Sequence, residues 1–174
     1  MKILALESSA TACSVALCED EKLIAQSYQN NRLTHSVTLM PMTVNLLSGC
    51  GISLDEVELI AVAAGPGSFT GLRIGVAAAK GLAWPAGKRC AACSTLESMS
   101  WNLAHTSGEI CAVMDARRHQ VYNARFASDG ATLTRLTPDR AISLEELADE
   151  LKKSGNPQIL VGDGAELCYN ELTK

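Results

Sequence analysis

The sequence predicts a two-lobed α/β protein in which one structural unit occurs twice. Short apolar segments of strand length alternate with segments of helical period, and the order strand, strand, strand, helix, strand, helix begins again at Ile110. With 174 residues, 47% of them hydrophobic, the chain can bury a core in each lobe. We therefore expect two duplicated βββαβα lobes, residues 1–107 and 108–174. We expect the second to be truncated, because its final helix is still running at Lys174.

Three strands open the first lobe as an antiparallel meander: residues 2–9, 12–20 and 21–29. A helix over 35–48 follows Thr34, which suits an N-cap, and Pro41 should kink this helix because it lies beyond the first turn. The nearly all-apolar segment 57–65 predicts a strand buried on both faces of a parallel sheet. A helix, a short strand and a helix complete the lobe: residues 69–84, 89–94 and 95–105.

The second lobe repeats this order. Two strands form a hairpin around Arg117–His119, and a third strand and a helix capped by Ser143 follow. An apolar strand ending in glycines then leads into the last helix. The expected elements are residues 110–118, 119–127, 131–138, 144–155, 158–164 and 165 onward.

Charge and targeting signals narrow the function classes. A formal net charge of −4 argues against a broad basic face and against tight binding to nucleic acid by this chain alone. The apolar N-terminal run is interrupted by Glu7 too early for a signal peptide, and no segment of about 18 uncharged apolar residues exists to span a membrane. We expect a cytoplasmic protein that does not bind a membrane.

Seven cysteines are scattered along the chain and are expected to be reduced core residues. Cys90 and Cys93 have the spacing of a redox or zinc half-site. No second ligand pair follows them, and on a strand an offset of three places the two side chains on opposite faces. The redox or zinc interpretation is therefore disfavoured.

The stretch GPGSFTGLRIG, residues 65–75, has the glycines of a phosphate loop but matches neither template. The Lys-Ser or Lys-Thr pair of one template is missing, and Thr70 stands where the third glycine of G-x-G-x-x-G is required. A small anion-binding nest over 65–68 stays open.

The helix that this stretch begins has a small residue at every fourth position, which predicts close approach of another helix. We expect this helix and the helix over 35–48 to pack side by side and to offer a joint apolar face to another subunit. The alternative is that both belong to an intramolecular core. The residues expected in the partner interface are Met40, Val44, Leu47, Gly71, Leu72, Gly75, Val76 and Ala79.

Several segments together resemble the bacterial TsaB (YeaZ) family, in the right order from Lys2 to about Phe126. They are LESSATACSVAL, THSVTLMP, AAGPGSFTGLRIGVAAAKGLA, STLES and MDARRHQVYNARF. The duplicated layout also resembles the superfamily of actin, sugar kinases and the Hsp70 nucleotide-binding domain (ASKHA), a likeness that concerns fold and does not establish function.

The family resemblance implies a role in forming threonylcarbamoyladenosine at position 37 of tRNAs that read codons beginning with A. TsaB-like proteins are non-catalytic partners of the related transferase TsaD, and the ATPase TsaE joins them. The resemblance further implies a homodimer in isolation, indirect contact with tRNA through the complex, and no intrinsic cofactor, with ATP or ADP only in the assembled complex.

TsaD-type proteins hold a metal between two histidines one helical turn apart. In this chain His35 is followed four residues later by Leu39, so one ligand is absent. We expect no metal site and no catalytic residue.

A nucleotide cleft is the alternative site. Glu7 with Ser8, and Asp115, end equivalent strands of the two lobes, where related kinases and ATPases place acidic residues around magnesium nucleotide. Gly162 and Gly164 loosely resemble the adenosine-side loop, although a turn from strand to helix needs glycine anyway. The family usually has Asp at the position of Glu7. A nucleotide-dependent kinase or ATPase is therefore the rival function, and polar strand ends are the structural alternative.

Arg117 and Arg118 form the most concentrated positive charge of the chain. Three interpretations stay open for them: contact with tRNA phosphate, contact with carboxylates of a partner, and a solvated turn.

Overall fold

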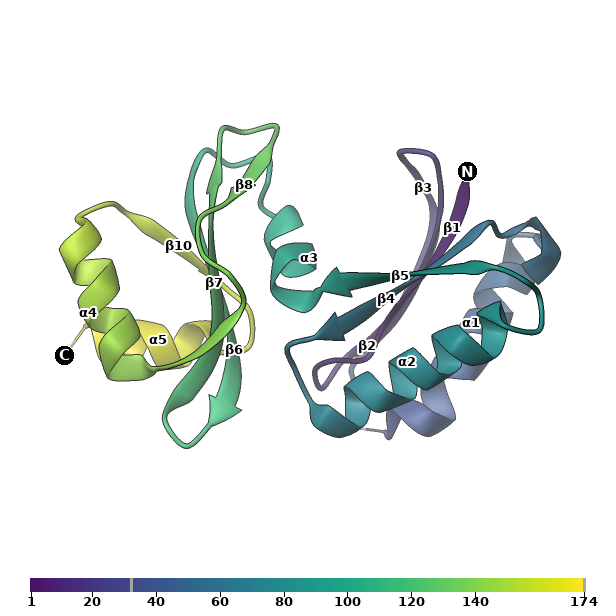
Figure 1. Cartoon of the computed structure of the whole chain (residues 1–174), viewed down its shortest axis with the longest axis horizontal. Coiled ribbons are helices and arrows are strands. Elements are labelled where there is room, and N and C mark those ends of the chain that lie inside the picture. Colours follow the sequence, from purple (N-terminus) through teal and green to yellow (C-terminus); the bar gives the residue numbers. More distant parts are fainter. Residues whose placement is uncertain (32, 174) are drawn as a thin grey trace. The chain divides into compact units, whose positions relative to one another are not determined.

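The computed structural model describes residues 1–31 and 33–173, which form two compact units, Met1–Cys93 (unit 1) and Ser94–Lys174 (unit 2) (Figure 1). The sequence placed the boundary after residue 107. The difference is helix α3 (Thr95–Trp101), because α3 packs on strands of unit 2. No helix of the described residues is long and apolar enough to cross a membrane.

Unit 1 is built on a five-stranded sheet of order β3-β2-β1-β4-β5. The first three strands pair antiparallel, and β4 pairs parallel with β1, so the predicted meander and the parallel strand after it are both confirmed. The strands are β1 (Lys2–Glu7), β2 (Cys13–Glu19), β3 (Lys22–Gln29), β4 (Leu59–Gly65) and β5 (Arg89–Ser94). A short 3-10 helix, η1 (Leu54–Glu56), precedes β4.

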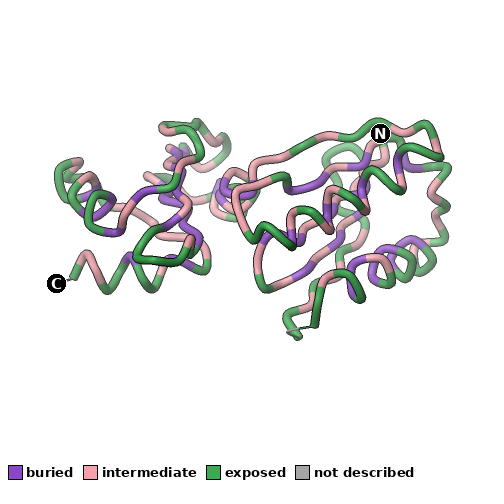
Figure 2. Tube along the Cα trace, turned by 60° about the horizontal axis from the view of Figure 1, so that its bottom comes forward, coloured by how far each residue is buried: buried purple, intermediate pink, exposed green. Residues whose placement is uncertain are grey.

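Helices α1 (His35–Gly49) and α2 (Phe69–Ala83) cover one face of this sheet. Both contribute buried side chains to a single core with alternate residues of β1, β2 and β4, and the two helices contact one another. Figure 2 shows buried residues along the strands and the inner sides of the helices. The expectation that the two helices pack side by side is therefore confirmed.

The helix ends follow local rules in part. Ser68 caps α2, because its side chain accepts a hydrogen bond from the Gly71 backbone N–H. Thr34 precedes α1 but makes no side-chain capping bond, and α1 continues through Pro41. The kink expected at Pro41 stays a prediction.

Unit 2 repeats the topology of unit 1. Its sheet has the order β10-β6-β7-β8, in which β10 pairs parallel with β6 as β4 does with β1. The elements are β6 (Gly108–Arg117), β7 (Gln120–Ser128), β8 (Leu133–Arg135), β9 (Arg140–Ser143), α4 (Leu144–Ser154), β10 (Gln158–Val161) and α5 (Ala165–Leu172). Two α/β lobes, the second with one strand more than expected, confirm the predicted fold class.

The main difference from the predicted elements lies between β7 and α4. The expected strand over 131–138 is three residues long, and β9 was not predicted. β9 pairs with the first half of β7, and β8 pairs with the second half. Pairing with β7 determines the bounds of both short strands, and alternation over three or four residues is too weak a signal to predict them.

Three of the seven cysteines are core residues, whereas Cys90 is exposed and the other three are half-buried, which corrects the expectation that all seven lie in the core. Cys13, Cys111 and Cys168 are buried, and burial raises the pKa of Cys111 to about 12, which makes its thiol unreactive. No disulfide occurs in residues 1–31 and 33–173. Cys90 and Cys93 both lie in β5, as expected.

Glu109 links three strands of unit 2. Its carboxylate accepts hydrogen bonds from Gln158 at 2.7 Å, Asn156 at 2.6 Å and Arg125 at 2.6 Å. The Gln158 bond is the largest of the causes that lower the pKa of Glu109 to about 2.

We expect the stability of the protein to fall as the pH drops from about 4.5 to about 2, by on the order of 1 to 2 kcal/mol from this group. The folded-state pKa is below the unfolded one, so the stabilisation is present above the unfolded pKa and is lost as the pH falls through the folded one. Glu109→Gln should flatten thermal melting against pH in that window. Glu166→Gln, at an exposed α5 residue, should leave the profile unchanged, and an equal flattening by both variants would contradict the assignment.

Candidate functional site

The glycine-rich stretch packs α2 against the turn between β1 and β2. A Cβ added at Gly71 would lie 2.0 Å from the backbone oxygen of Ser8, and one at Gly67 would lie 2.5 Å from that of Ser9. Ser8 Oγ donates a 2.9 Å hydrogen bond to the Gly71 carbonyl, and Ser68 N donates a 2.7 Å bond to the Ser9 carbonyl. Only glycine permits this approach, so the stretch serves close backbone packing.

The small-residue stripe of α2 faces the core of unit 1, which corrects the expectation that it meets another subunit. Gly71, Gly75 and Ala79 are buried, and a Cβ at Gly75 would lie 2.4 Å from Ser8 Oγ. Leu47 of α1 is also buried in this core. The four-residue spacing did report a close approach, but the approaching surface is the strand end and turn of the same unit.

The outward sides of α1 and α2 form a largely apolar surface. Val37 and Val44 of α1 are 59% and 58% exposed, and α1 contains no Asp, Glu, Lys or Arg. Phe69 and Trp84, at the two ends of α2, are 75% and 86% exposed. We call this surface the helical face; it consists of Val37, Met40, Pro41, Val44, Phe69, Leu72, Arg73, Val76, Lys80 and Trp84.

Four of the residues expected at a partner interface belong to this face. Val44 is exposed, whereas Met40, Leu72 and Val76 are half-buried. The charged members of the face are both cationic, and the Arg73 guanidinium lies 5.3 Å from the centre of the Phe69 ring. An apolar surface on two adjacent helices with cations among it fits a partner surface that is apolar and carries acidic residues.

Comparison with known proteins decides the family. The TsaB of Bacillus subtilis (strain 168), named a tRNA threonylcarbamoyladenosine biosynthesis protein, is 35% identical over 167 residues, which is 96% of this chain and 73% of the relative. The protein of the same name from Escherichia coli (strain K12) is 32% identical, over 94% of this chain and 72% of its own length. This chain belongs to the TsaB (YeaZ) family.

A solved structure and a family model agree with that assignment. The structure described as YeaZ from Pseudomonas aeruginosa matches with a TM-score of 0.76 and 29% identity, over 83% of this chain and 68% of that chain. The model described as "TsaD: tRNA N6-adenosine threonylcarbamoyltransferase" matches residues 23–167. The matched residues include α1, α2 and most of unit 2.

The acidic strand ends of this TsaB-family chain are engaged in their own turns. Glu7 Oε1 accepts a hydrogen bond from Ser9 N, and Ser8 is buried against α2. Asp115 Oδ1 accepts from Arg117 N at 2.7 Å, and Asp115 N donates to Asp163 Oδ1 at 3.2 Å. Both acidic residues thus have a local structural role, and a nucleotide cleft stays a prediction.

Gly162 and Gly164 have a packing role in unit 2. A Cβ at Gly162 would lie 2.0 Å from the backbone oxygen of Val113, and Gly162 has a φ of 119°. A Cβ at Gly164 would lie 3.1 Å from the Met114 carbonyl carbon. This close approach of the β10–α5 turn to β6 accounts for both glycines.

His35 is half-buried at the start of α1. Its Nε2 lies 2.7 Å from the Ala10 backbone oxygen, and Leu39, one turn later, is buried. In the part of the chain that the structure describes, no three His, Cys, Asp or Glu side chains gather in a way that could hold a metal ion. His35 therefore fastens α1 to the turn between β1 and β2.

The turn between β6 and β7 has an unusual backbone. Arg117, Arg118 and His119 have φ angles of 66°, 54° and 58°, and all three are exposed. Arg117 pairs with Gln120, so Arg118 and His119 form a two-residue hairpin turn that Asn-Gly would suit better. Each left-handed non-glycine residue costs roughly 1 to 2 kcal/mol.

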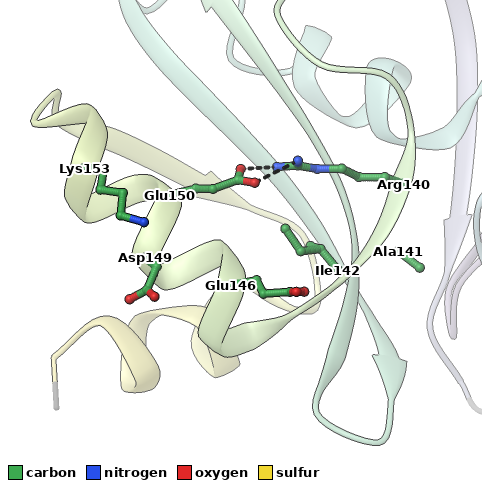
Figure 3. A pocket seen from close by; sticks show the side chains of 7 residues that line it. All are labelled: Arg140, Ala141, Ile142, Glu146, Asp149, Glu150 and Lys153. Atoms are coloured by element: carbon green, nitrogen blue, oxygen red, sulfur yellow. Dashed lines mark hydrogen bonds and ion pairs between the residues drawn. The ribbon is translucent and has the colours of Figure 1, made fainter.

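A groove of unit 2 lies between β9 and α4 and has a volume of about 400 Å³ (Figure 3). Arg140 donates two hydrogen bonds to Glu150, at 2.5 and 3.1 Å, and two to the buried Asn123 Oδ1, both at 3.1 Å. The Arg140 bond lowers the pKa of Glu150. These hydrogen bonds connect β9 to α4 and β7, so the residues that line the groove have a structural role.

Sequence reasoning missed Phe69 and Trp84 as exposed members of the helical face. Buried positions 71, 75, 79 and 83 recur every four residues, and the exposed residues of α2 occupy the opposite side of the helix. Assigning the small-residue stripe to the core would have placed both aromatic rings outside.

Proposed function

We propose that this chain is a non-catalytic subunit of the machinery that forms threonylcarbamoyladenosine at position 37 of tRNAs reading codons beginning with A. Its helical face binds a TsaD-type transferase, which carries out the chemistry. The names of the curated relatives support the pathway. The observation that carries the partner role is the exposure of apolar residues on an uncharged α1 beside Phe69 of α2.

The match to the TsaD family model supports the choice of partner. It spans α1 and α2, so a TsaD-type enzyme has related helices at the same positions. Two related subunits can bring equivalent helical faces together about an approximate twofold axis. The same surface serves a homodimer when the partner is absent, and self-association therefore competes with the enzyme.

The residues at the two candidate sites support the proposal that the chain is catalytically silent. Leu39 is buried where a second metal ligand is required, and Glu7 is bonded within its own turn. Nucleotide and a TsaE-type ATPase belong to the assembled complex, and tRNA is held mainly by the enzyme because this chain is acidic overall.

Reconstitution tests this function. We expect the purified chain to form a one-to-one complex with the TsaD-type enzyme of the same genome in sedimentation velocity. We also expect it to raise threonylcarbamoyladenosine formation on an unmodified tRNA transcript at least tenfold. Enzyme that works equally well without the chain would contradict the proposal. Micromolar binding of magnesium ATP with turnover by the isolated chain in calorimetry would favour the rival kinase or ATPase function.

A further inference from the structure

The turn between β6 and β7 presents cationic side chains at an energetic cost to the backbone. Three consecutive non-glycine residues, Arg117 to His119, adopt left-handed φ angles. The turn is fixed from two sides, because Asp115 Oδ1 accepts the Arg117 N–H and the His119 carbonyl accepts the Leu144 N–H at 3.0 Å. Asn-Gly would form this turn with less backbone strain. We therefore attribute the presence of Arg and His here to a function of their side chains.

Arg117 and Arg118 differ from the other arginines of unit 2. Arg125, Arg135 and Arg140 each form an ion pair with a carboxylate. Within residues 1–31 and 33–173, no ion pair involves Arg117 or Arg118. Their guanidinium groups are exposed and available to an anion from outside the chain.

The surroundings favour phosphate over a protein surface. Every residue of the tip, from Arg117 to Gln120, is polar and exposed, and a protein interface needs a buried apolar centre. The tip is a narrow projection at the end of the β6–β7 hairpin (Figure 1), which suits contact with single phosphates. Unit 2 carries twelve Asp and Glu against eight Lys and Arg, so the rest of the unit repels nucleic acid and the contact is confined to the tip.

We propose that Arg117 and Arg118 contact backbone phosphates of the tRNA substrate in the assembled complex. The inference rests on the proposed function, in which the enzyme holds most of the tRNA and this chain adds a local contact. The expected contribution is to the position of the tRNA and to its affinity, without recognition of base sequence.

The test measures binding of an unmodified tRNA transcript to the complex of this chain with its TsaD-type enzyme, over a range of salt concentrations. Arg117→Gln/Arg118→Gln should weaken binding several-fold at low salt. It should also reduce the slope of log affinity against log salt by roughly 1.5, since each phosphate contact contributes about 0.7 to 0.9. Lys152→Gln/Lys153→Gln removes the same charge from exposed residues of α4 and should leave the slope unchanged.

A second variant separates structure from function. Arg118→Asn/His119→Gly places the favoured residues in the two-residue turn, so it should raise the melting temperature while it still weakens tRNA binding. Unchanged tRNA binding by both hairpin variants, in a complex that still forms and modifies tRNA, overturns this inference alone. If the hairpin variants bind the enzyme more weakly but the salt slope of tRNA binding is unchanged, the inference is overturned in favour of contact with carboxylates of the partner protein. Failure of the unaltered chain to bind the enzyme overturns the proposed function and this inference with it.

Discussion

Gly71→Ala is expected to destabilise unit 1 by about 3 kcal/mol. The added Cβ would lie 2.0 Å from the Ser8 backbone oxygen, so α2 must move away from the turn between β1 and β2. Overpacking of this kind costs about 1 to 3 kcal/mol and occasionally more. The gain in helix propensity of roughly 1 kcal/mol is too small to offset a backbone clash at the upper end of that range. The melting temperature should fall by about 10 °C or more.

Gly81→Ala is the matched control in the same helix. Gly81 is exposed, and a Cβ there meets nothing within 4 Å, so the substitution should stabilise the protein by about 0.5 to 1 kcal/mol. Equal melting temperatures for the two variants would show that Gly71 is not closely packed. Gly75→Leu tests the earlier expectation directly: a partner-facing stripe predicts a folded subunit that no longer associates, whereas the packing against Ser8 predicts an unstable one.

The predictable part of this fold rests on long, periodic segments. Most strands and helices of both units were predicted because their segments show a clear period or, as in the four-residue β10, a continuous apolar run. β9 was not, since its four residues are held by pairing with β7. The position of α3 depends on which sheet it packs against, and local sequence does not encode that choice.

The sequence indicated α1 and α2 as the elements of the candidate surface, but it did not indicate which sides of these helices are exposed. The repeat of small residues in α2 predicts close packing against another segment, but it does not indicate whether that segment belongs to the same unit or to a partner. The structure shows that Ser8 of the same unit packs against Gly71 and Gly75 of this repeat. The helix therefore turns Phe69 and Trp84 outward, so the helical face that we propose as the partner surface includes large aromatic side chains. Likewise, the adjacency of Arg117 and Arg118 was visible in the sequence, whereas their left-handed backbone was not.

Val44→Asp is expected to weaken association with the TsaD-type enzyme by a hundredfold or more while leaving the subunit folded. Val44 is 58% exposed near the middle of α1, a helix without charged residues. Burying an unpaired carboxylate in the centre of an apolar interface costs several kcal/mol, and each 1.4 kcal/mol is about a factor of ten in affinity. Val and Asp have similar helix propensities, so the melting temperature should change little.

Leu167→Asp gives a matched comparison for this prediction, because Leu167 is an exposed apolar residue on α5 of unit 2, outside the helical face. It should leave the affinity for the enzyme within about threefold of the unaltered chain, since surface substitutions outside an interface contribute little. Titration calorimetry of both variants with the enzyme, alongside thermal melting, separates binding from stability. A Val44→Asp chain that binds as tightly as the Leu167→Asp chain would place the partner on another surface. Loss of binding by Val44→Asp with an unchanged melting temperature would assign the contact to α1, and the same variant should then fail to stimulate tRNA modification.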